Sequence, residues 1–369
     1  MKRLAFALVA LAAMAGATIS TADARTRPAA GPHVWVIVLE NKSYEKTFAA
    51  DSPAPYLANT LTRRGALLRQ YYGTGHLSLD NYITMMSGQA PNPQTQADCQ
   101  YYNDFVSPTG GALDANGQVL GTGCVYPKTV LTFADQLDSA RISWKGYMED
   151  MGTPCRHPQL NQQDPTQKPK VGDQYAARHD PFVYFHSIID DPARCDAHVV
   201  DMNTHLTADL ASTSTTPRFS FITPNLCDDG HDAPCVDGRP GGLVSADAFL
   251  KTWVPKIADS PAFKQDGVLI VMFDESDAVP NSDTRSCCQE QAGLNTPSPG
   301  ITGPGGGLMG AVVLSKFVTP GSVSDVPYNH YSFLRTLEDL YGLSHLGYAG
   351  ASGLQPFGTD VFSTKPVPR

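Results

Sequence analysis

Four short apolar runs recur along the chain and predict the central strands of a sheet. They begin at Val34 (VWVIVL), Phe219 (FSFI), Val268 (VLIVMF) and Gly310 (GAVVL). Each run is almost continuously hydrophobic rather than alternating. This pattern is typical of strands covered on both faces, as in a mostly parallel sheet between two layers of helices.

Amphipathic helical patterns fill the segments between these runs. The clearest begin at Pro55 (PYLANTLTRRGALL), Thr129 (TVLTFADQLDSA), Asp201 (DMNTHLTADLA), Ser245 (SADAFLKTWVPKIAD) and Tyr331 (YSFLRTLEDLYGL). Strands therefore alternate with helices, which predicts an α/β fold with a three-layer α/β/α sandwich. Neither an internal repeat nor a linker divides the chain, so we expect one domain over residues 25–369 with long loops.

The first residues read as a secretion signal. Lys2 and Arg3 precede an apolar run over residues 4–17, and the small-x-small pattern Ala22-Asp23-Ala24 follows. This predicts a signal peptide over residues 1–24 and a secreted or periplasmic mature protein. The apolar run is short for a membrane anchor, and no later segment is long enough to span a bilayer.

Cysteine content fits an oxidising compartment. The chain has eight cysteines, an even number, in Gly-, Pro- and Asp-rich segments that suit disulfides. We expect neighbours to pair: Cys99 with Cys124, Cys155 with Cys195, and Cys227 with Cys235. Cys287 and Cys288 either bridge each other or pair elsewhere. The net charge of -9 argues against a nucleic-acid binder.

Polar residues close two of the apolar runs. Glu40 and Asn41 follow the first run, and Asp274 and Glu275 follow the third. In an open α/β sheet these strand ends converge where ligands bind. Clustered carboxylates repel one another unless a cation neutralises them, so the pattern predicts a divalent metal held by oxygen ligands. Ordinary helix caps or solvated loop starts are the alternative for each residue taken singly.

A candidate nucleophile lies in the segment GHLSLDNYITMMSG, which begins at Gly75. Ser78 would start a helix running into Gly88, where main-chain N–H groups favour a bound phosphate. Metal coordination would further activate the hydroxyl. An ordinary helix cap is the alternative function for this serine.

These and further motifs carry a resemblance. The segments VIVLENKSYEKTF, GHLSLDNYITMMSG, RHDPFVYF, FITPNLCDDGHD, VMFDESD and NHYSFLRTLEDLYGL resemble the bacterial phosphoesterase family of secreted acid phosphatases and phosphatidylcholine-type phospholipases C, in the alkaline phosphatase superfamily. The resemblance implies an alkaline-phosphatase-like fold with Ser78 as nucleophile and metal ligand. It also implies a metal and a phosphoryl site, whose residues are Glu40, Asn41, Asp274 and Glu275 for the metal and His179, Asn225, His231 and His330 for the phosphoryl group.

Some positions depart from the family pattern. Leu77 and Asp80 stand where relatives often have prolines, so the local shape around Ser78 differs. Asp228, His231 and Asp232 could hold a second metal, which leaves the metal count open. Hard oxygen ligands favour calcium, magnesium or manganese, with zinc as a further candidate. Protonated histidines would favour activity at acidic pH.

The sequence therefore predicts a secreted, metal-dependent acid phosphatase that hydrolyses phosphomonoesters through a phosphoserine intermediate. Its expected partners are small phosphomonoesters or phosphoinositides. A phospholipase C acting on phosphodiesters is the first alternative. A non-catalytic exported protein that binds phosphate or a metal is the second.

Overall fold

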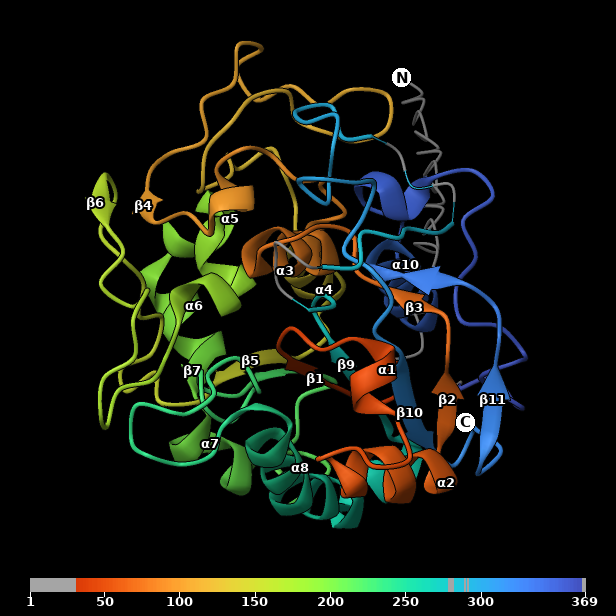
Figure 1. Ribbon diagram of the computed structural model, residues 1–369. Coiled ribbons are helices and arrows are strands. Elements are labelled where there is room, and N and C mark those ends of the chain that lie inside the picture. Colours follow the sequence, from red (N-terminus) through yellow and green to blue (C-terminus); the bar gives the residue numbers. More distant parts are fainter. Residues whose placement is uncertain (1–30, 278–281, 289, 291, 367–369) are drawn as a thin grey trace, which may run out of the picture.

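A large sheet forms the centre of the molecule (Figure 1). The computed structural model describes residues 31–277, 282–288, 290 and 292–366. The sheet has eight strands in the order β11-β2-β10-β9-β1-β8-β5-β7. Their bounds are β1 Val34–Leu39, β2 Ala66–Leu68, β5 Trp144–Met148, β7 Val199–Asp201, β8 Phe219–Thr223, β9 Val268–Phe273, β10 Ala311–Ser315 and β11 Ser322–Ser324.

The sheet is mostly parallel. β1 pairs in parallel with β8 and β9, and β5 pairs in parallel with β8 and β7. β10 is antiparallel to both of its neighbours, β9 and β2, and β11 is parallel to β2. The four predicted strands occupy the adjacent positions β10-β9-β1-β8, and every residue of β1 and β9 is buried. The prediction of doubly covered central strands is confirmed.

Helices cover the sheet on both sides. Figure 1 shows α3, α4 and α10 above the sheet and α2, α7 and α8 below it, which confirms the α/β/α sandwich. The α-helices are α1 Tyr44–Thr47, α2 Thr62–Arg64, α3 Ser78–Ser87, α4 Phe133–Ala140, α5 His186–Ile189, α6 Pro192–His198, α7 Met202–Asp209, α8 Gly242–Asp259, α9 Pro261–Asp266 and α10 His330–Tyr341.

Aromatic contacts join the layers. Trp35 of β1 packs against Phe263 of α9, with ring centroids 5.9 Å apart. Phe133 of α4 contacts Phe219 of β8 at 5.0 Å and Tyr341 of α10 at 5.9 Å. Burying such large side chains provides the main favourable free energy of folding.

Shorter elements complete the described chain. They are the two-residue strands β3 Tyr71–Tyr72, β4 Tyr101–Tyr102, β6 Gln162–Gln163 and β12 Tyr328–Asn329, the π-helix η1 Tyr56–Leu61, and the 3-10 helices η2 Thr95–Ala97, η3 Ala177–His179, η4 Pro181–Tyr184 and η5 Gly347–Gly350.

Four predicted helices are confirmed as α4, α7, α8 and α10, but the helix predicted from Pro55 is wrong over its last residues. There the chain leaves the helix at Gly65, and Ala66–Leu68 form β2. A Cβ atom at Gly65 would lie 2.4 Å from the main-chain oxygen of Val313, so glycine permits the close approach to β10. The apolar residues Ala66, Leu67 and Leu68 therefore pair with a strand instead of extending a helix.

All eight cysteines are paired. The disulfides Cys99–Cys124, Cys155–Cys195 and Cys227–Cys235 confirm the expected pairing, and Cys287 and Cys288 bridge each other. The predicted signal peptide lies outside the described residues. Within residues 31–366, as far as they are described, we find no helix of the length and apolarity that crossing a bilayer requires.

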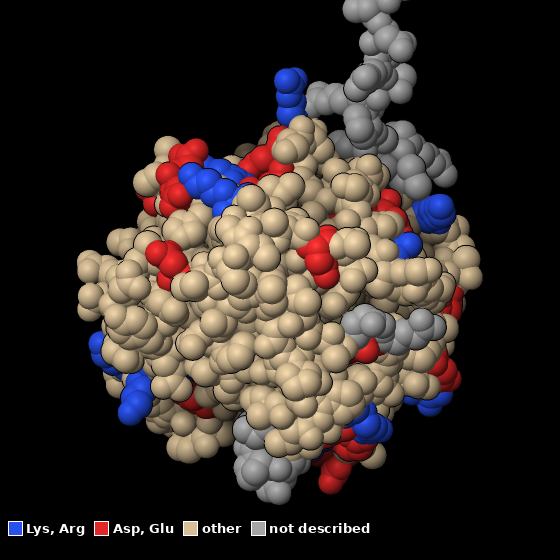
Figure 2. All heavy atoms as spheres, turned by 90° about the horizontal axis from the view of Figure 1, so that it is seen from above, with Lys and Arg blue, Asp and Glu red and all other residues tan. Residues whose placement is uncertain are grey.

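The parallel strands end at one edge of the sheet, where polar residues follow them. Glu40 comes after β1, Glu149 after β5, Asn225 shortly after β8, and Asp274 after β9. Figure 2 shows that residues without charge cover most of the face seen from above. Glu40 and Asp274 do not contribute to that surface because both are fully buried.

Candidate active site

Ser78 is held against the end of β1. The side-chain oxygen of Asn81, in the first turn of α3, accepts hydrogen bonds from the N–H groups of Thr74 and Gly75 at 3.0 and 2.9 Å, which folds the preceding loop back onto the helix. Ser78 is only 2% exposed. Its Oγ donates a hydrogen bond to Glu40 Oε2 at 2.7 Å. The nucleophile predicted from sequence thus contacts one of the predicted metal ligands.

Glu40 bonds two residues that are one helical turn apart. Tyr82, four residues after Ser78 on α3, donates its hydroxyl to Glu40 Oε1 at 2.5 Å. Burial raises the pKa of Glu40 well above its usual range, and the charges of Asp274 and Asp229 raise it further. Glu40 therefore needs either a proton or a nearby cation.

Asn41 connects the ends of β1 and β9. It adopts a left-handed conformation with φ 48°, and its main-chain N–H donates to Asp274 Oδ1 at 3.1 Å. Its side-chain N–H group donates to Glu275 Oε1 at 2.6 Å. His76 pairs with the other oxygen of Glu275. Burial raises the pKa of Asp274 to about 6 and that of Glu275 well above its usual range.

Asp229 and His179 complete the cluster. His179 Nδ1 lies 3.2 Å from Asp229 Oδ2, and His179 Nε2 lies 3.5 Å from Glu40 Oε1. The ring of Tyr82 stacks on His179 with centroids 5.4 Å apart. Ligand-type atoms of Glu40, His179 and Asp229 lie within 4.8 Å of one another. Five segments that are distant in sequence thus meet beside Ser78.

The sequence analysis missed Asp229 and Tyr82. Asp229 lies directly between Asp228 and His231, two of the residues considered for a second metal, but spacing along a loop does not indicate which aspartate faces inward. A signal for Tyr82 was present, because residues four apart share one face of a helix. Tyr82 therefore had to lie on the same face as Ser78.

The buried atoms of this cluster fit a divalent cation. Among the described residues, the buried polar atoms without a hydrogen-bond partner include Asn41 Oδ1, Asp229 Oδ2, Asp274 Oδ2 and both ring nitrogens of His179. The oxygens and one nitrogen of a neutral imidazole carry lone pairs that can bind a cation, and a buried polar atom without a partner costs free energy. Carboxylate, amide and imidazole donors suit magnesium, calcium, manganese or zinc. The residues present therefore fit a metal site.

Comparison with protein families identifies the chain. The model of the Phosphoesterase family matches residues 50–344. The chain belongs to the Phosphoesterase family. The matched segment runs from the loop after α1 to the residues that follow α10, so it includes Ser78 and Asp274 and begins just after Glu40.

Relatives within this family include enzymes of fungi and bacteria. The chain is 24% identical to the probable acid phosphatase of Kluyveromyces lactis over 86% of its own length and 60% of the relative's. It is also 24% identical to the phosphatidylinositol-3-phosphatase of Mycobacterium tuberculosis, over 86% of its own length and 79% of the relative's. It thus spans about three fifths of the fungal phosphatase.

The fold is shared with the alkaline phosphatase superfamily. A protein of that superfamily from Vibrio parahaemolyticus superposes with a TM-score of 0.51 at 13% identity, over 91% of this chain and 74% of the other. Similarity at this identity concerns the arrangement of the sheet and its helices. It agrees with the fold that the sequence motifs implied.

His330 supports the end of β9 rather than facing solvent. Its Nε2–H donates to the main-chain oxygen of Asp274 at 2.5 Å, and its Nδ1 accepts from the hydroxyl of Tyr71 at 3.0 Å. Burial lowers the pKa of His330 to about 4. Burial also lowers the pKa of His179 well below its usual range, with Arg178 adding to the effect. Burial therefore favours the neutral form of both imidazoles.

Asn225 is engaged in the turn after β8. Its side-chain N–H group donates to Asp150 Oδ2 at 2.9 Å, and its Oδ1 accepts from the N–H groups of Cys227 and Asp228. The structure does not bring its amide into contact with Ser78 or Glu40. Asp228 in turn pairs with Arg239 at 2.6 Å.

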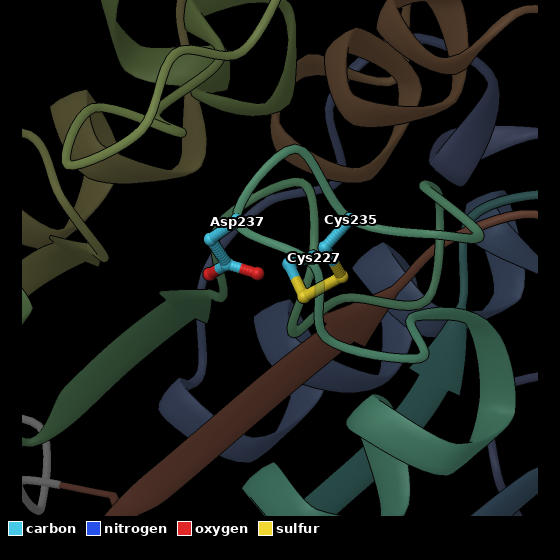
Figure 3. A group of neighbouring side chains, drawn as sticks. All are labelled: Cys227, Cys235 and Asp237. Carbon is cyan, nitrogen blue, oxygen red and sulfur yellow. A yellow bond between two sulfur atoms is a disulfide. The ribbon is translucent and has the colours of Figure 1, made fainter.

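The loop that contains His231 is closed by a disulfide. Figure 3 shows Cys227 and Cys235 bonded to each other near Asp237. Although these three residues are near enough to share a metal, the sulfur atoms are bonded to each other and offer no thiolate. His231 extends from the same loop, with its N–H bonded to Asp229 Oδ1 at 2.7 Å and its Nδ1 2.8 Å from Asp232.

A depression of about 900 Å³ lies beside the cluster. Its lining includes Asn41, Lys42 and His231 together with residues of α1 and α8. Two residues of its lining, Asn41 and His231, also contact the buried cluster, so the depression lies next to the carboxylates. Its volume suits a small organic phosphate.

Proposed function

We propose that this protein hydrolyses phosphomonoesters, with Ser78 as the nucleophile and a divalent metal bound by the adjoining acidic cluster. The observation that carries the proposal is the 2.7 Å hydrogen bond from Ser78 Oγ to Glu40, next to buried carboxylate oxygens that lack partners. A serine at the start of a helix, beside a cation site, is suited to phosphoryl transfer.

The residues that would hold the metal are Glu40, Asn41, Asp274 and Glu275, with Ser78 as a further ligand and Asp229 and His179 on the other side of Glu40. When bound, such a metal acts as a Lewis acid that stabilises negative charge on phosphoryl oxygens. One ion or two would be compatible with this donor set. Magnesium, calcium, manganese and zinc remain the candidates.

The residues of this chain have separate tasks in the reaction. Ser78 Oγ attacks phosphorus as the ester P–O bond breaks, and its proton passes to Glu40 Oε2, the oxygen to which it is bonded. Tyr82 holds Glu40 in position through the second oxygen. The leaving alkoxide takes a proton from water in the adjoining depression. Water then attacks the phosphoserine: Glu40 returns its proton to Ser78 Oγ as the serine P–O bond breaks, and the hydroxide left by the first step takes the proton of the attacking water.

The relatives and the volume of the depression beside the cluster support this substrate class. Acid phosphatases and a phosphatidylinositol-3-phosphatase are among the relatives, so small phosphomonoesters and phosphoinositides are the substrates to test. The four disulfides favour export after removal of residues 1–24, with residues 25–369 as one phosphoesterase domain.

The test compares two serine-to-alanine changes on the same helix. Ser78→Ala should lower kcat for p-nitrophenyl phosphate by at least about 1,000-fold, because loss of a covalent nucleophile costs several orders of magnitude. Ser87→Ala is the matched control. Ser87 lies at the other end of α3 and bonds the main-chain oxygen of Ile83, so this variant should keep activity within about twofold.

Parallel assays separate the alternatives. Purified protein with added magnesium, manganese, calcium or zinc is tested for phosphate release from p-nitrophenyl phosphate and from a phosphatidylinositol phosphate, and for phosphocholine release from phosphatidylcholine. A larger kcat/KM for phosphocholine release would identify a phospholipase C. Phosphate binding without turnover of any ester would identify a binding protein and end the hydrolase proposal.

A further inference from the structure

Arg178 is a buried cation whose hydrogen-bonding capacity is poorly used. The residue is 4% exposed, and its polar contacts with the described residues are all long. Nη1 lies 3.4 Å from the main-chain oxygen of Gln167, Nη2 lies 3.5 Å from His231 Nε2, and Nε lies 3.7 Å from Asp98 Oδ2. A guanidinium has five N–H donors and keeps its charge in proteins, so donors remain free for an anion.

Another arginine of this chain, Arg194, makes shorter hydrogen bonds than Arg178. Arg194 bonds Asp138 at 2.8 Å, Asp135 at 2.9 Å and the main-chain oxygen of Ser187 at 2.6 Å. Its side chain is more exposed than that of Arg178, at 17% against 5%. Arg194 thus makes three short hydrogen bonds even where water could replace a partner. The long contacts of Arg178 call for another ligand.

Arg178 lies beside the candidate active site. It precedes His179, whose ring nitrogens are 3.2 Å from Asp229 and 3.5 Å from Glu40. Burial lowers the pKa of His179 and raises that of Asp229, and the positive charge of Arg178 adds to the first effect and offsets part of the second, so it acts at close range. Its Nη2 approaches His231, which lines the depression through which we expect substrate to enter.

Lys42 also lies beside these carboxylates, but its donors are in use. Its ammonium donates to the main-chain oxygens of Glu40, Asn41 and Gly230 at 3.3, 3.0 and 2.8 Å. An ammonium has three donors, and all three are engaged. A dianionic phosphoryl group entering this acidic site would therefore find the open donors on Arg178 rather than on Lys42.

Asp98 ties Arg178 to the nucleophile helix. Asp98 Oδ1 accepts the N–H of Leu79, the residue after Ser78, at 3.0 Å, while Oδ2 faces Arg178 Nε. Gln167 donates to the main-chain oxygen of Asp98 at 3.0 Å, and its own main-chain oxygen faces Arg178. The Cys99–Cys124 disulfide fixes the chain next to Asp98. Asp98 and Gln167 thus orient the guanidinium.

We propose that Arg178 is a substrate-binding residue whose guanidinium binds the non-bridging oxygens of the phosphoryl group. The inference rests on the proposed function and extends it. Two planar N–H donors match phosphate oxygens, which is the geometry that arginine provides and lysine does not.

The experiment measures phosphate binding and turnover in separate proteins. Inorganic phosphate is titrated calorimetrically into metal-loaded Ser78→Ala and into the Ser78→Ala/Arg178→Gln double variant. In the active enzyme, kcat/KM for p-nitrophenyl phosphate is measured for Arg178→Lys, Arg178→Gln and the control Arg194→Gln. Circular dichroism and the melting temperature establish that each variant is folded.

We expect the loss of activity to be larger when the charge at residue 178 is removed than when only the planar guanidinium is replaced. Arg178→Gln should weaken phosphate binding at least tenfold and lower kcat/KM at least about 100-fold. The kcat/KM of Arg178→Lys should lie between that of Arg178→Gln and that of the wild type. Arg194→Gln should change kcat/KM by less than about threefold. If Arg178→Gln does not fold, Arg178→Lys decides: a loss of tenfold or more in kcat/KM in a folded variant supports the proposal.

Two outcomes would overturn it. One is a phosphate Kd that is unchanged by Arg178→Gln, and the other is a loss in kcat/KM no larger than that of Arg194→Gln. These outcomes are distinct from failure of the proposed function. A wild-type protein without esterase activity would end the hydrolase proposal, whereas the phosphate titration would still test whether Arg178 binds the anion.

Discussion

Removal of the proposed metal should make the stability of this protein depend steeply on pH. Without a cation, burial raises the pKa of Asp274 from 3.8 to about 6 and raises the pKa of Glu40, Glu275 and Asp229 well above their usual values. The folded protein then binds protons that the unfolded chain has already released. Stability is therefore full below about pH 4 and falls as pH rises through 6 and beyond.

The magnitude follows from the pKa difference. For Asp274 the shift is about 2 units, and each unit corresponds to about 1.4 kcal/mol, so ionising this group alone costs on the order of 3 kcal/mol of unfolding free energy. Further carboxylates titrate at higher pH and add to the loss. A bound divalent cation compensates the charges and removes this part of the pH dependence.

Urea unfolding followed by circular dichroism tests this, with disulfides intact, at pH 4.5 and pH 7.5, in EDTA or in millimolar magnesium. We expect the EDTA sample to lose at least about 3 kcal/mol more than the magnesium sample between the two pH values. Asp274→Asn should reduce the loss in EDTA between these pH values by about 2 kcal/mol, because the amide cannot ionise and part of the roughly 3 kcal/mol is already lost at pH 4.5.

A remote carboxylate gives the control. Glu338 on α10 is buried, bonds the N–H of Leu346 and has its pKa raised to about 9. Glu338→Gln should therefore change the pH profile equally in EDTA and in magnesium. Equal pH slopes for the wild type in the two buffers, or no flattening by Asp274→Asn, would refute the reasoning.

Two further changes test the helix that carries the nucleophile. Tyr82→Phe removes the 2.5 Å hydrogen bond to Glu40 but keeps the ring stacked on His179. The kcat/KM for p-nitrophenyl phosphate should therefore fall about tenfold, with a small change in melting temperature. Unchanged kcat/KM would exclude a role for Tyr82 in holding Glu40. Asp80 is buried with neither carboxylate oxygen bonded to a described residue, and burial raises its pKa. Ionisation of Asp80 therefore lowers the free energy of unfolding as pH rises through that pKa. Asp80→Asn should therefore be more stable than the wild type by about 1–3 kcal/mol at pH 8 and not below pH 4, as measured by urea unfolding; no difference at pH 8 would contradict this.

The amino-acid sequence by itself determined the middle of the sheet and its two acidic ends. The runs that form β1 and β9 are wholly apolar and are followed directly by Glu40 and Asp274, so their burial and position could be predicted from local pattern. Ser78 was predicted because a glycine-rich turn precedes a helical pattern. These features are local, since they depend on the periodicity of a few consecutive residues.

Short strands at the sides of the sheet were beyond such reasoning. β2, β7 and β11 have three residues each, too few for a period to be recognised. β2 also follows directly on a helical pattern, and its pairing with β10 makes it a strand. The free energy that selects a strand there comes from the neighbouring strand, not from the residues themselves.

Tertiary structure alone decided which polar residues face the cluster. Asp228, Asp229 and Asp232 have similar local sequence surroundings, yet Asp229 meets His179 while Asp228 pairs with Arg239. Arg178 likewise acquires its position from contacts with Asp98, 80 residues earlier, and with His231, 53 residues later. The direction of a loop side chain depends on the elements that enclose the loop, and those elements come together only when the chain folds.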